Sequence, residues 1–277
     1  MKIISFQGTH GAYSDLACRK FYKDYKTFPC KTFEDTFNAV IDGRAELAMI
    51  PVENSIAGRV ADIHSLLEKI NLKIVSENYL KVEHHLMSRK TIKIELVKNV
   101  YSHIHALSQC KENIKKLNLN PINFIDTAGA AEFIASSDGP NAAIASELSA
   151  KIYKLKILKE NLEDKENNVT RFLVFSKNFS KVGIKNKVIT TIIFHTNNIP
   201  TALYKALGCF ASEKVNLTRL ESFFVNKKFE QSSFLVDVES HPEKKSFKNA
   251  IKELSNYSTK INILGFYKAS SYRSKIN

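Results

Sequence analysis

Apolar and polar residues alternate along the first part of the chain in a way that pairs short strands with helices. A β-rich run at residues 3–6 leads into a helical pattern at 14–22, and a run at 47–52 leads into one at 63–70. The same order recurs with strands at 98–101, 123–125 and 142–145 and helices at 104–117, 128–135 and 148–155. Alternation of this kind up to about residue 180 predicts an α/β domain with largely parallel sheets, whose ligands bind beyond the carboxyl ends of the strands.

After residue 187 the pattern changes. We expect strands at 188–195, 216–225, 229–239 and 260–267, helices at 200–213 and 243–257, and a hairpin turn at Asn226-Lys227-Lys228. This βαββαβ order is typical of the ferredoxin-like fold. The polar stretch 179–187 is the expected linker between the two parts, and the tail from Ala269 onward is expected to be frayed.

The composition is that of a soluble globular protein. A chain of 277 residues exceeds a typical domain, so two domains are expected, and 44% hydrophobic residues are ample for their cores. No apolar run approaches the roughly 20 residues that span a bilayer. The cysteines at 18, 30, 110 and 209 are far apart, which favours buried free thiols in a reducing cytoplasm over disulfides or zinc ligands.

The net charge of +13 favours an anionic partner. The lysines are scattered along amphipathic stretches, however, and no basic arm, zinc finger or RNP motif accompanies them. We therefore expect a small polyanionic substrate, with neither nucleic acid nor membrane as a partner.

The run from Glu166 to Phe172 is the strongest candidate for chemistry. Thr170 supplies an uncharged hydroxyl and Arg171 a fixed fork of donors that matches a carboxylate, at a point where a loop feeds a strand. These types suggest a site for a small carboxylated substrate, although a polar loop with one solvated arginine would show the same letters. Polar strand-to-helix junctions at residues 8–14, 53–58, 102–103, 126–129 and 146 predict helix N-termini that line a cleft with neutral donors.

Histidines and acids near these junctions give weaker signals. Ser102 is expected to cap a helix, and His103 to be a polar junction residue rather than a metal ligand. Glu53 is either a second acid or an anchor for its own loop. For His84 the sequence names no partner, and a solvated or otherwise satisfied side chain is the default.

Several of these junctions together resemble the prephenate dehydratases, specifically the single-function form with a C-terminal ACT domain. The blocks that carry the resemblance are residues 6–8 with 11–14, 50–58, 102–110, 126–131, 168–172, 198–203 and 216–222. Their order covers nearly the whole chain. The resemblance implies conversion of prephenate to phenylpyruvate, carbon dioxide and water, without a cofactor or metal.

The family's fold, carried onto this chain, implies a catalytic domain at 1–182 and an ACT domain at 188–270. The catalytic domain would resemble periplasmic binding proteins, with lobe 1 at 1–80 and 160–182 and lobe 2 at 81–159. Because the chain crosses twice between the lobes, a hinge that closes on the substrate is expected.

The resemblance also assigns roles to residues. Thr170 matches the family's essential threonine and would assist departure of the 4-hydroxyl, while Arg171 would clamp the pyruvyl carboxylate. Phe172 would pack on the substrate ring or, with greater weight, on the lobe interface. The remaining residues expected at the substrate are Asn54, Ser55 and Thr127, suited to the ring carboxylate, and Ala12, Tyr13 and Ser14.

The ACT part implies a phenylalanine effector and a homodimer or homotetramer. The expected effector residues are Asn198, Thr201, Ala202, Leu203, Glu221 and Ser222. Thr201 stands where the family has glycine, and Phe223 and Phe224 stand where it has arginine and proline, so the chain departs from the effector motif. An ACT domain kept only for dimerisation is the alternative.

Two other functions fit the same residues. One is arogenate dehydratase, which performs the same chemistry on a substrate with an amine in place of the keto group. The other is a non-catalytic two-lobed sensor of amino or keto acids that signals through the ACT pair.

Overall fold

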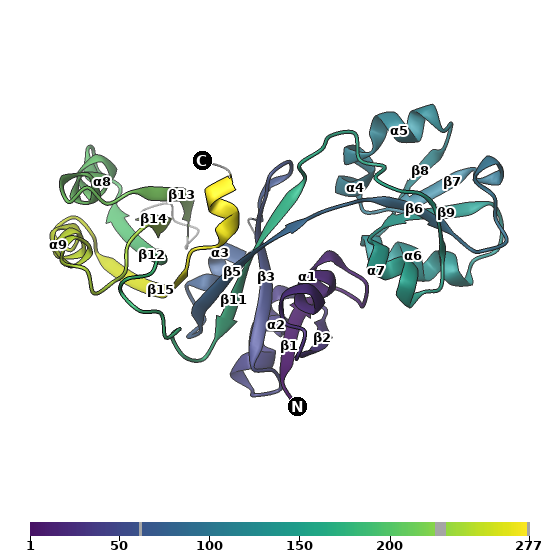
Figure 1. Cartoon of the computed structure of the whole chain (residues 1–277). Helices are drawn as coiled ribbons and strands as arrows, with labels where there is room; N and C mark the ends of the chain where they lie inside the picture. The colour runs from purple at the N-terminus through teal and green to yellow at the C-terminus, as the bar shows by residue number, and fades with distance from the viewer. Residues whose placement is uncertain (61–62, 225–230, 276–277) are drawn as a thin grey trace. The chain divides into compact units, whose positions relative to one another are not determined.

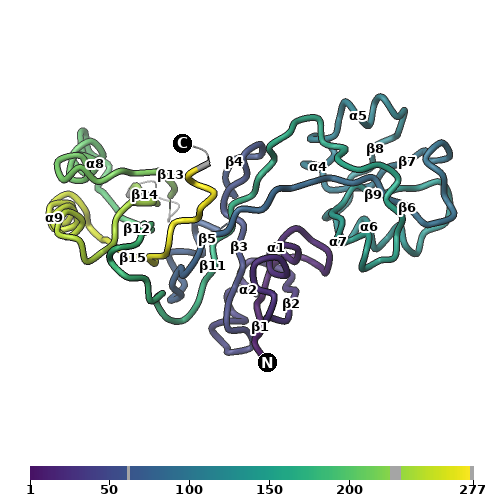
Figure 2. The backbone as a smooth tube through the Cα atoms, in the orientation of Figure 1, coloured from purple at the N-terminus to yellow at the C-terminus, as the bar shows by residue number. Residues whose placement is uncertain are grey.

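The structure is a computed structural model, and it describes residues 1–60, 63–224 and 231–275. It divides into two compact units. The first comprises residues 1–60 and 78–172, and the second comprises residues 61–77 and 173–277. Strands β5 (Lys73–Lys81) and β11 (Val169–Ser176) each contribute residues to both units, and Figure 2 shows the course of the two strands.

The first unit holds two sheets. In the first sheet the residues of β11 lie beside β3, in the order β11-β3-β1-β2, and β4 pairs with the end of β3. Strand β1 is parallel to both β2 and β3. The elements of this part are β1 (Ile3–Gln7), α1 (Tyr13–Phe21), β2 (Lys26–Cys30), α2 (Phe33–Ile41), β3 (Leu47–Asn54) and β4 (Gly58–Arg59).

The second sheet has the order β10-β6-β9-β7-β8. Strand β7 is parallel to β8 and β9, whereas β6 is antiparallel to β9 and β10. The α/β class is confirmed, and the sheet is mixed rather than wholly parallel. Its elements are β6 (His85–Ser88), a 3₁₀ turn η2 (Ile94–Leu96), β7 (Asn99–Ser102), α4 (Ile104–Gln109), α5 (Lys111–Lys116), β8 (Asn120–Asn123), α6 (Thr127–Ser136), β9 (Asn141–Ala145), α7 (Glu147–Ile152) and β10 (Lys156–Lys159).

Two crossing segments of the first unit join these sheets, residues 82–84 and 160–168. They run beside each other, because the Val82 N–H donates to the Asn168 carbonyl (2.8 Å) and the Leu162 N–H to the His84 carbonyl (2.7 Å). The chain therefore passes twice between the two sheets of the first unit. The polar residues of these crossings lie between the two sheets' elements, where the candidate site is found.

The second unit contains the βαββαβ order that the hydrophobic pattern predicts. Its antiparallel strands have the order β13-β14-β12-β15, and β15 meets β5 in parallel at the pair Gly265 and Ile74. Helices α8 and α9 lie side by side and share a buried core with the sheet (Figure 1). The elements are α3 (His64–Leu67), β12 (Val188–Asn197), α8 (Ala202–Ser212), β13 (Leu217–Phe224), β14 (Gln231–Val238), α9 (Lys245–Leu254), β15 (Lys260–Lys268) and a 3₁₀ turn η3 (Ser271–Lys275).

Several sequence predictions can be compared directly with these units. The expected hairpin turn at residues 226–228 lies outside the described residues. The prediction of a frayed tail is wrong as far as residue 275: η3 is held because Arg273 donates from Nε and Nη2 to the carboxylate of Glu77, at 2.7 and 2.9 Å.

All four cysteines are free and buried, as expected. Within the described ranges, no helix has both the length and the apolar character needed to cross a membrane.

Candidate active site

Thr170 lies near the start of β11 and is half-buried. Its hydroxyl oxygen is 2.9 Å from Nδ2 of Asn54, the last residue of β3. The Asn54 amide has a single possible orientation, because its Oδ1 accepts the backbone N–H groups of Ile56 (3.0 Å) and Ala57 (2.8 Å). Nδ2 must therefore face Thr170 and donate to it.

The direction of that bond determines what Thr170 can do. Its oxygen accepts a hydrogen bond from Asn54, and its own O–H has no acceptor among the residues that the structure describes. A hydroxyl that accepts from a fixed amide keeps its proton available for another group.

Asn54 also extends the network away from Thr170. Its Nδ2 donates to Oδ1 of Asn168 (2.7 Å), and Nδ2 of Asn168 donates to Oε1 of Gln109 on α4 (2.8 Å). Asn168 is 1% exposed, so these bonds satisfy an amide that would otherwise be costly to bury. The network joins the end of β3, the second crossing segment and a helix of the second sheet.

Ser55 fastens the loop after β3 to the chain before β11. Its hydroxyl donates to the Asn167 carbonyl (2.8 Å) and accepts the Val169 N–H (2.9 Å), and its N–H donates to the Val169 carbonyl (2.9 Å). Asn167 has φ of 69°, a left-handed conformation that asparagine tolerates. Ser55 is thus brought beside the Thr170 segment, with its hydroxyl already engaged.

The loop at residues 8–14 meets the second sheet's elements through Gly11. The Gly11 carbonyl accepts the hydroxyls of Ser146 (2.6 Å) and Ser149 (2.9 Å) at the start of α7. Gly11 has φ of 96°, and a Cβ there would stand 2.7 Å from the Ser149 hydroxyl. Only glycine fits both the conformation and the close approach.

Residues 12–14 follow this contact. Ala12 is the residue before α1, and Ser14 is buried within that helix. The Tyr13 hydroxyl lies 2.7 Å from Nδ1 of His84 and 2.9 Å from the Glu83 carbonyl. Burial raises the pKa of Tyr13 well above its ordinary value, so the phenol stays protonated. Tyr13 therefore contacts the first crossing segment rather than Thr170.

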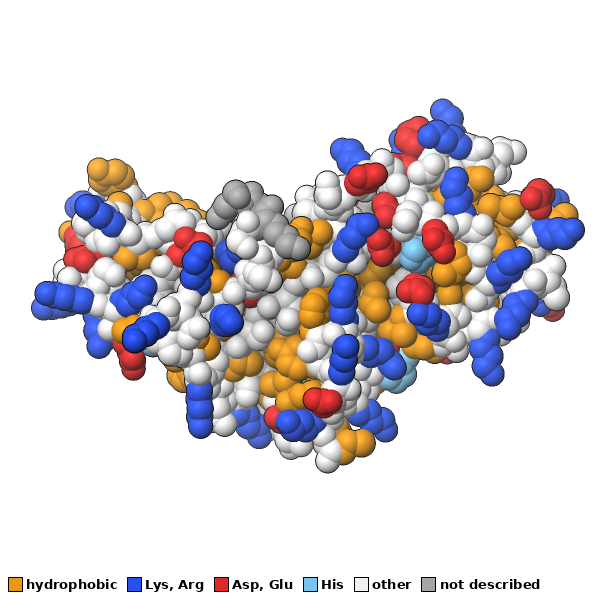
Figure 3. Space-filling model, in the orientation of Figure 1, with side chains coloured by type: hydrophobic (Ala, Val, Ile, Leu, Met, Phe, Trp, Pro, Cys, Tyr) orange, Lys and Arg blue, Asp and Glu red, His pale blue; other side chains and the backbone are white. Residues whose placement is uncertain are grey.

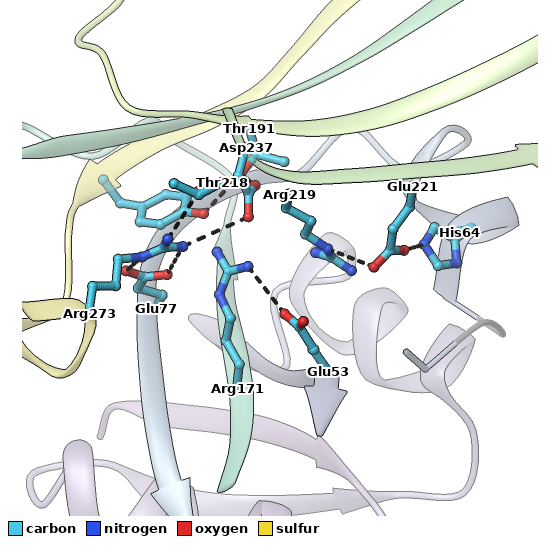
Figure 4. A network of polar contacts seen from close by, with 11 residues as sticks. Glu53, His64, Glu77, Arg171, Thr191, Thr218, Arg219, Glu221, Asp237 and Arg273 are labelled. Atoms are coloured by element: carbon cyan, nitrogen blue, oxygen red, sulfur yellow. Dashed lines mark hydrogen bonds and ion pairs between the residues drawn. The ribbon is translucent and has the colours of Figure 1, made fainter. Parts of the chain in front are cut away.

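Arg171 and Phe172 differ from Thr170 in their surroundings. Consecutive residues of a strand point to opposite faces, so the side chains of Thr170 and Arg171 leave β11 in opposite directions. Arg171 is 4% exposed, with Nη1 3.9 Å from Oε2 of Glu53 (Figure 4). The alternative of a solvated arginine is wrong. Phe172 is 1% exposed and belongs to the buried core.

The junctions of the second sheet are partly as expected. Thr127 is the first residue of α6, half-buried, behind the N-cap Asp126, which accepts the Gly129 N–H at 2.6 Å. Ser102 does not cap α4, because its hydroxyl donates to the Ile144 carbonyl (2.6 Å); the N-cap is His103, whose Nδ1 accepts the His105 N–H. No described group of three or more His, Cys, Asp or Glu side chains has a metal-binding arrangement.

The expected effector residues lie in the second unit. Thr201 caps α8 in the left-handed conformation, with φ of 69° and no side-chain cap bond. Asn198 precedes it, and Ala202 and Leu203 form the first turn of the helix. On β13, Ser222 is exposed, whereas Glu221 accepts from Nε of Arg219 (2.8 Å) and forms a short contact with Nε2 of His64.

A pocket of about 900 Å³ belongs to the second unit alone. Lys185, Lys187, Lys244 and Lys268 are among the residues around it. On the face drawn in Figure 3, basic side chains are spread over both units with acidic ones between them, consistent with a solvated lysine coat.

The structure thus brings together Thr170, Asn54 and Ser55, and it adds three residues to which the sequence assigned no role at the site: Gln109, Asn168 and His84. Gln109 and Asn168 lie inside motif blocks, and their amide side chains are the sequence signal for them. His84 offers no local signal, since its partners are 71 and 25 positions away.

Comparison with known proteins shows to which family the chain belongs. The family model for prephenate dehydratase matches residues 4–180. The chain belongs to the prephenate dehydratase family. It carries the domain of a dehydratase, which is a carbon–oxygen lyase.

Relatives in this family cover the chain almost completely. It is 45% identical over 276 residues, 99% of this chain and 98% of the relative, to the bifunctional N-acyl-homoserine lactone acylase/prephenate dehydratase of Komagataeibacter europaeus. It is 36% identical to arogenate dehydratase/prephenate dehydratase 2 of Arabidopsis thaliana, over 95% of this chain and 72% of the relative. The crystal structure of prephenate dehydratase from Arthrobacter aurescens in complex with L-Phe superposes with a TM-score of 0.87, at 27% identity, over 96% of this chain and 90% of that one.

Proposed function

We propose that this protein converts prephenate to phenylpyruvate, with loss of carbon dioxide and water. Membership of the family supports the reaction, and the observation that carries it is the direction of the Asn54–Thr170 hydrogen bond. Thr170 receives a hydrogen bond from a fixed amide, 2.9 Å away, and keeps its own proton for the substrate.

The chemistry needs little more than this. As the ring carboxylate leaves as carbon dioxide, its bonding electrons enter the ring and expel the 4-oxygen, which takes a proton from Thr170 and departs as water. Solvent then returns a proton to the threonine. Because the ring becomes aromatic, the enzyme supplies only a modest additional push, and acid assistance of this kind is worth roughly 10²–10⁴-fold.

Neutral groups suit the rest of the site. A strong cation at the ring carboxylate would oppose the reaction, since decarboxylation disperses that charge. We propose that Asn54 and Ser55 act mainly by holding the Thr170 segment, since their polar atoms are already engaged. Thr127 and the loop with Ala12, Tyr13 and Ser14 are the proposed substrate-facing residues from other segments. Arg171 was expected to clamp the pyruvyl carboxylate; because it is buried beside Glu53 and leaves β11 on the face opposite Thr170, we propose instead that it supports the end of β3.

We propose the same domain organisation as the sequence analysis: a two-lobed catalytic domain at 1–182, with lobe 2 at 81–159, and an ACT domain at 188–270. The βαββαβ topology of the second unit supports the ACT assignment. The Arthrobacter aurescens relative was solved with L-Phe, which supports phenylalanine as the effector. A homodimer or homotetramer in the cytoplasm completes the proposal.

The decisive experiment is direct. Purified protein is mixed with prephenate, and phenylpyruvate is measured in alkali against a buffer blank. Product formation is expected, and its absence from a folded sample would refute the proposal. Arogenate in a parallel reaction tests the alternative substrate, which the Arabidopsis relative's name supports. A sensor would bind prephenate without turning it over.

A second activity deserves the same test. The Komagataeibacter europaeus relative, which aligns with this chain over 98% of its own length, is named an N-acyl-homoserine lactone acylase as well. Incubation with an N-acyl-homoserine lactone and detection of the released fatty acid would show whether this chain shares that activity.

A further inference from the structure

His84 occupies a position that the proposed reaction does not yet use. It is 3% exposed, in the crossing segment between β5 and β6, and both ring nitrogens have partners. Nε2 lies 2.8 Å from Oε1 of Gln109, and Nδ1 lies 2.7 Å from the Tyr13 hydroxyl. The ring therefore links α1 of the first sheet's layer to α4 of the second.

The network determines which nitrogen carries hydrogen. Asn54 is oriented by its two backbone donors, so Nδ2 faces Asn168 and Oδ1 of Asn168 faces Asn54. Nδ2 of Asn168 then faces Gln109, which places Oε1 of Gln109 toward both Asn168 and His84. Since a carbonyl oxygen only accepts, Nε2 of His84 must be protonated.

The other nitrogen follows from the ring's surroundings. Burial lowers the pKa of His84, which outweighs the opposing effects of the Gln109 hydrogen bond and of the Glu163 charge. The Glu163 carboxylate is engaged by the His84 backbone N–H (2.8 Å), and neighbouring His85 adds a further lowering effect. The neutral ring then leaves Nδ1 as an acceptor, so the single proton of the Tyr13 hydroxyl goes to Nδ1 at 2.7 Å rather than to the Glu83 carbonyl at 2.9 Å.

The consequence appears at Gln109. Two protein donors, from His84 and Asn168, occupy its amide oxygen. Its amide nitrogen has no partner among the described residues and is not buried, so the side chain presents an N–H₂ group to solvent. A dianionic substrate requires donors, and the opposite orientation of this amide would present an oxygen instead.

We propose that His84 is a positioning residue for the dehydratase reaction: through its Nε2–H it holds the Gln109 amide with the nitrogen free for a substrate carboxylate, at the far end of the network that begins at Thr170 and Asn54. The proposal rests on the proposed function. The two partners of the His84 ring, Tyr13 on α1 and Gln109 on α4, belong to the layers of different sheets. His84 can therefore hold Gln109 only when both layers of the first unit are folded.

Two substitutions of His84 test the contacts of its two ring nitrogens separately. The amide of glutamine reaches about as far as Nε2, so His84→Gln keeps the donor to Gln109 and loses the partner of Tyr13. Asparagine is shorter and its amide reaches only as far as Nδ1, so His84→Asn keeps the Tyr13 contact and loses the donor. We expect His84→Asn to lower kcat/KM for prephenate about tenfold, as for one lost buried hydrogen bond, and His84→Gln to stay within about twofold of wild type. The same change one residue later, His85→Gln, is the control and should leave turnover unchanged.

Thermal unfolding of each variant separates positioning from folding. If both His84 variants lose stability and activity alike, the ring is merely structural and the proposal is overturned. Nitrogen NMR of histidine-labelled protein gives an independent reading: His84 should show a protonated Nε2 and an unprotonated Nδ1. The reverse tautomer would refute the assigned directions whatever the activity. Failure of wild-type protein to turn over prephenate would instead refute the proposed function.

Discussion

The two units of this protein each contain a buried polar network, and the two are built from different chemistry. Around Thr170 in the first unit, the Asn54 amide donates to both Thr170 and Asn168, and Asn168 donates to Gln109, without an ionised group in these bonds. In the second unit, the Glu77 carboxylate accepts hydrogen bonds from Nε and Nη2 of Arg273. Oδ2 of Asp237 lies 3.9 Å from the same Nη2 (Figure 4).

The difference matches what each network does. Neutral donors can be oriented toward a reacting group without fixing the charge that the reaction must move. Ion pairs in a buried setting hold segments together strongly, because breaking one leaves an unpaired charge away from water. Here Glu77 is on β5 and Arg273 is 196 positions later, so one pair fastens the end of the chain to the strand. The first network should therefore control turnover, and the second stability.

The largest effect should come from Thr170→Ala. Loss of the hydroxyl that donates to the leaving oxygen should lower kcat for prephenate by about 10²–10⁴-fold with little change in KM. Thr170→Ser keeps a hydroxyl and is the matched control, expected to retain most of the activity. Equal activity of the alanine variant and wild type would remove Thr170 from the chemistry.

Stability should respond most to Glu77→Gln. The Glu77 side chain is fully buried and that of Arg273 is 16% exposed. The substitution therefore removes the negative charge that Glu77 places beside the Arg273 guanidinium. We expect a loss of about 3–5 kcal/mol in the free energy of unfolding, measured in urea, with kcat per folded molecule unchanged. Replacing both partners by apolar residues of similar size should cost less than either single change. A cost below 1 kcal/mol for Glu77→Gln would show that the pair does not hold the segment.

A pH dependence should be seen at Glu221. Burial alone would raise the pKa of this carboxyl, but the hydrogen bond from His64 and the charge of Arg219 outweigh it and lower the pKa to about 2. Because the pKa of Glu221 is lower in the folded than in the unfolded protein, its carboxylate stabilises the fold. This stabilisation is fully present above the pKa of the unfolded chain, about 4.3, and is lost as the pH falls toward about 2. Wild type should exceed Glu221→Gln by about 2–3 kcal/mol at pH 7, and the gap should narrow across that window. A gap independent of pH between 5 and about 2 would contradict this reading.

The smallest effect is expected at Thr201. A β-branched residue with φ of 69° is strained, since a left-handed conformation costs about 1–2 kcal/mol for a residue with a Cβ. Thr201→Gly should raise the free energy of unfolding by about 1 kcal/mol, and Thr201→Ala, which keeps the Cβ, should not. Phenylalanine binding by both variants, followed calorimetrically, would also show whether this departure from the family motif weakens an effector site.

The order of elements could largely be predicted from residue patterns alone. The alternation up to about residue 180 and the βαββαβ order after 187 are local properties, because a strand and a helix each carry their own hydrophobic period. Elements with weak periods were not predicted: β2 contains Pro29, and β5 and β6 lie on either side of a crossing segment rather than in a strand-to-helix unit. Thr170 and Asn54 were both identified from short blocks that match a family.

What the sequence by itself determined is therefore the class of fold, the family and the residue types brought to the site. Tertiary structure decided the rest: that Arg171 leaves β11 on the face opposite Thr170, that the turn η3 is held by Glu77, and that His84 completes a network with Gln109. Each of these depends on partners distant along the chain. No local pattern encodes them, because a hydrogen bond's direction is set only when all of its neighbours are in place.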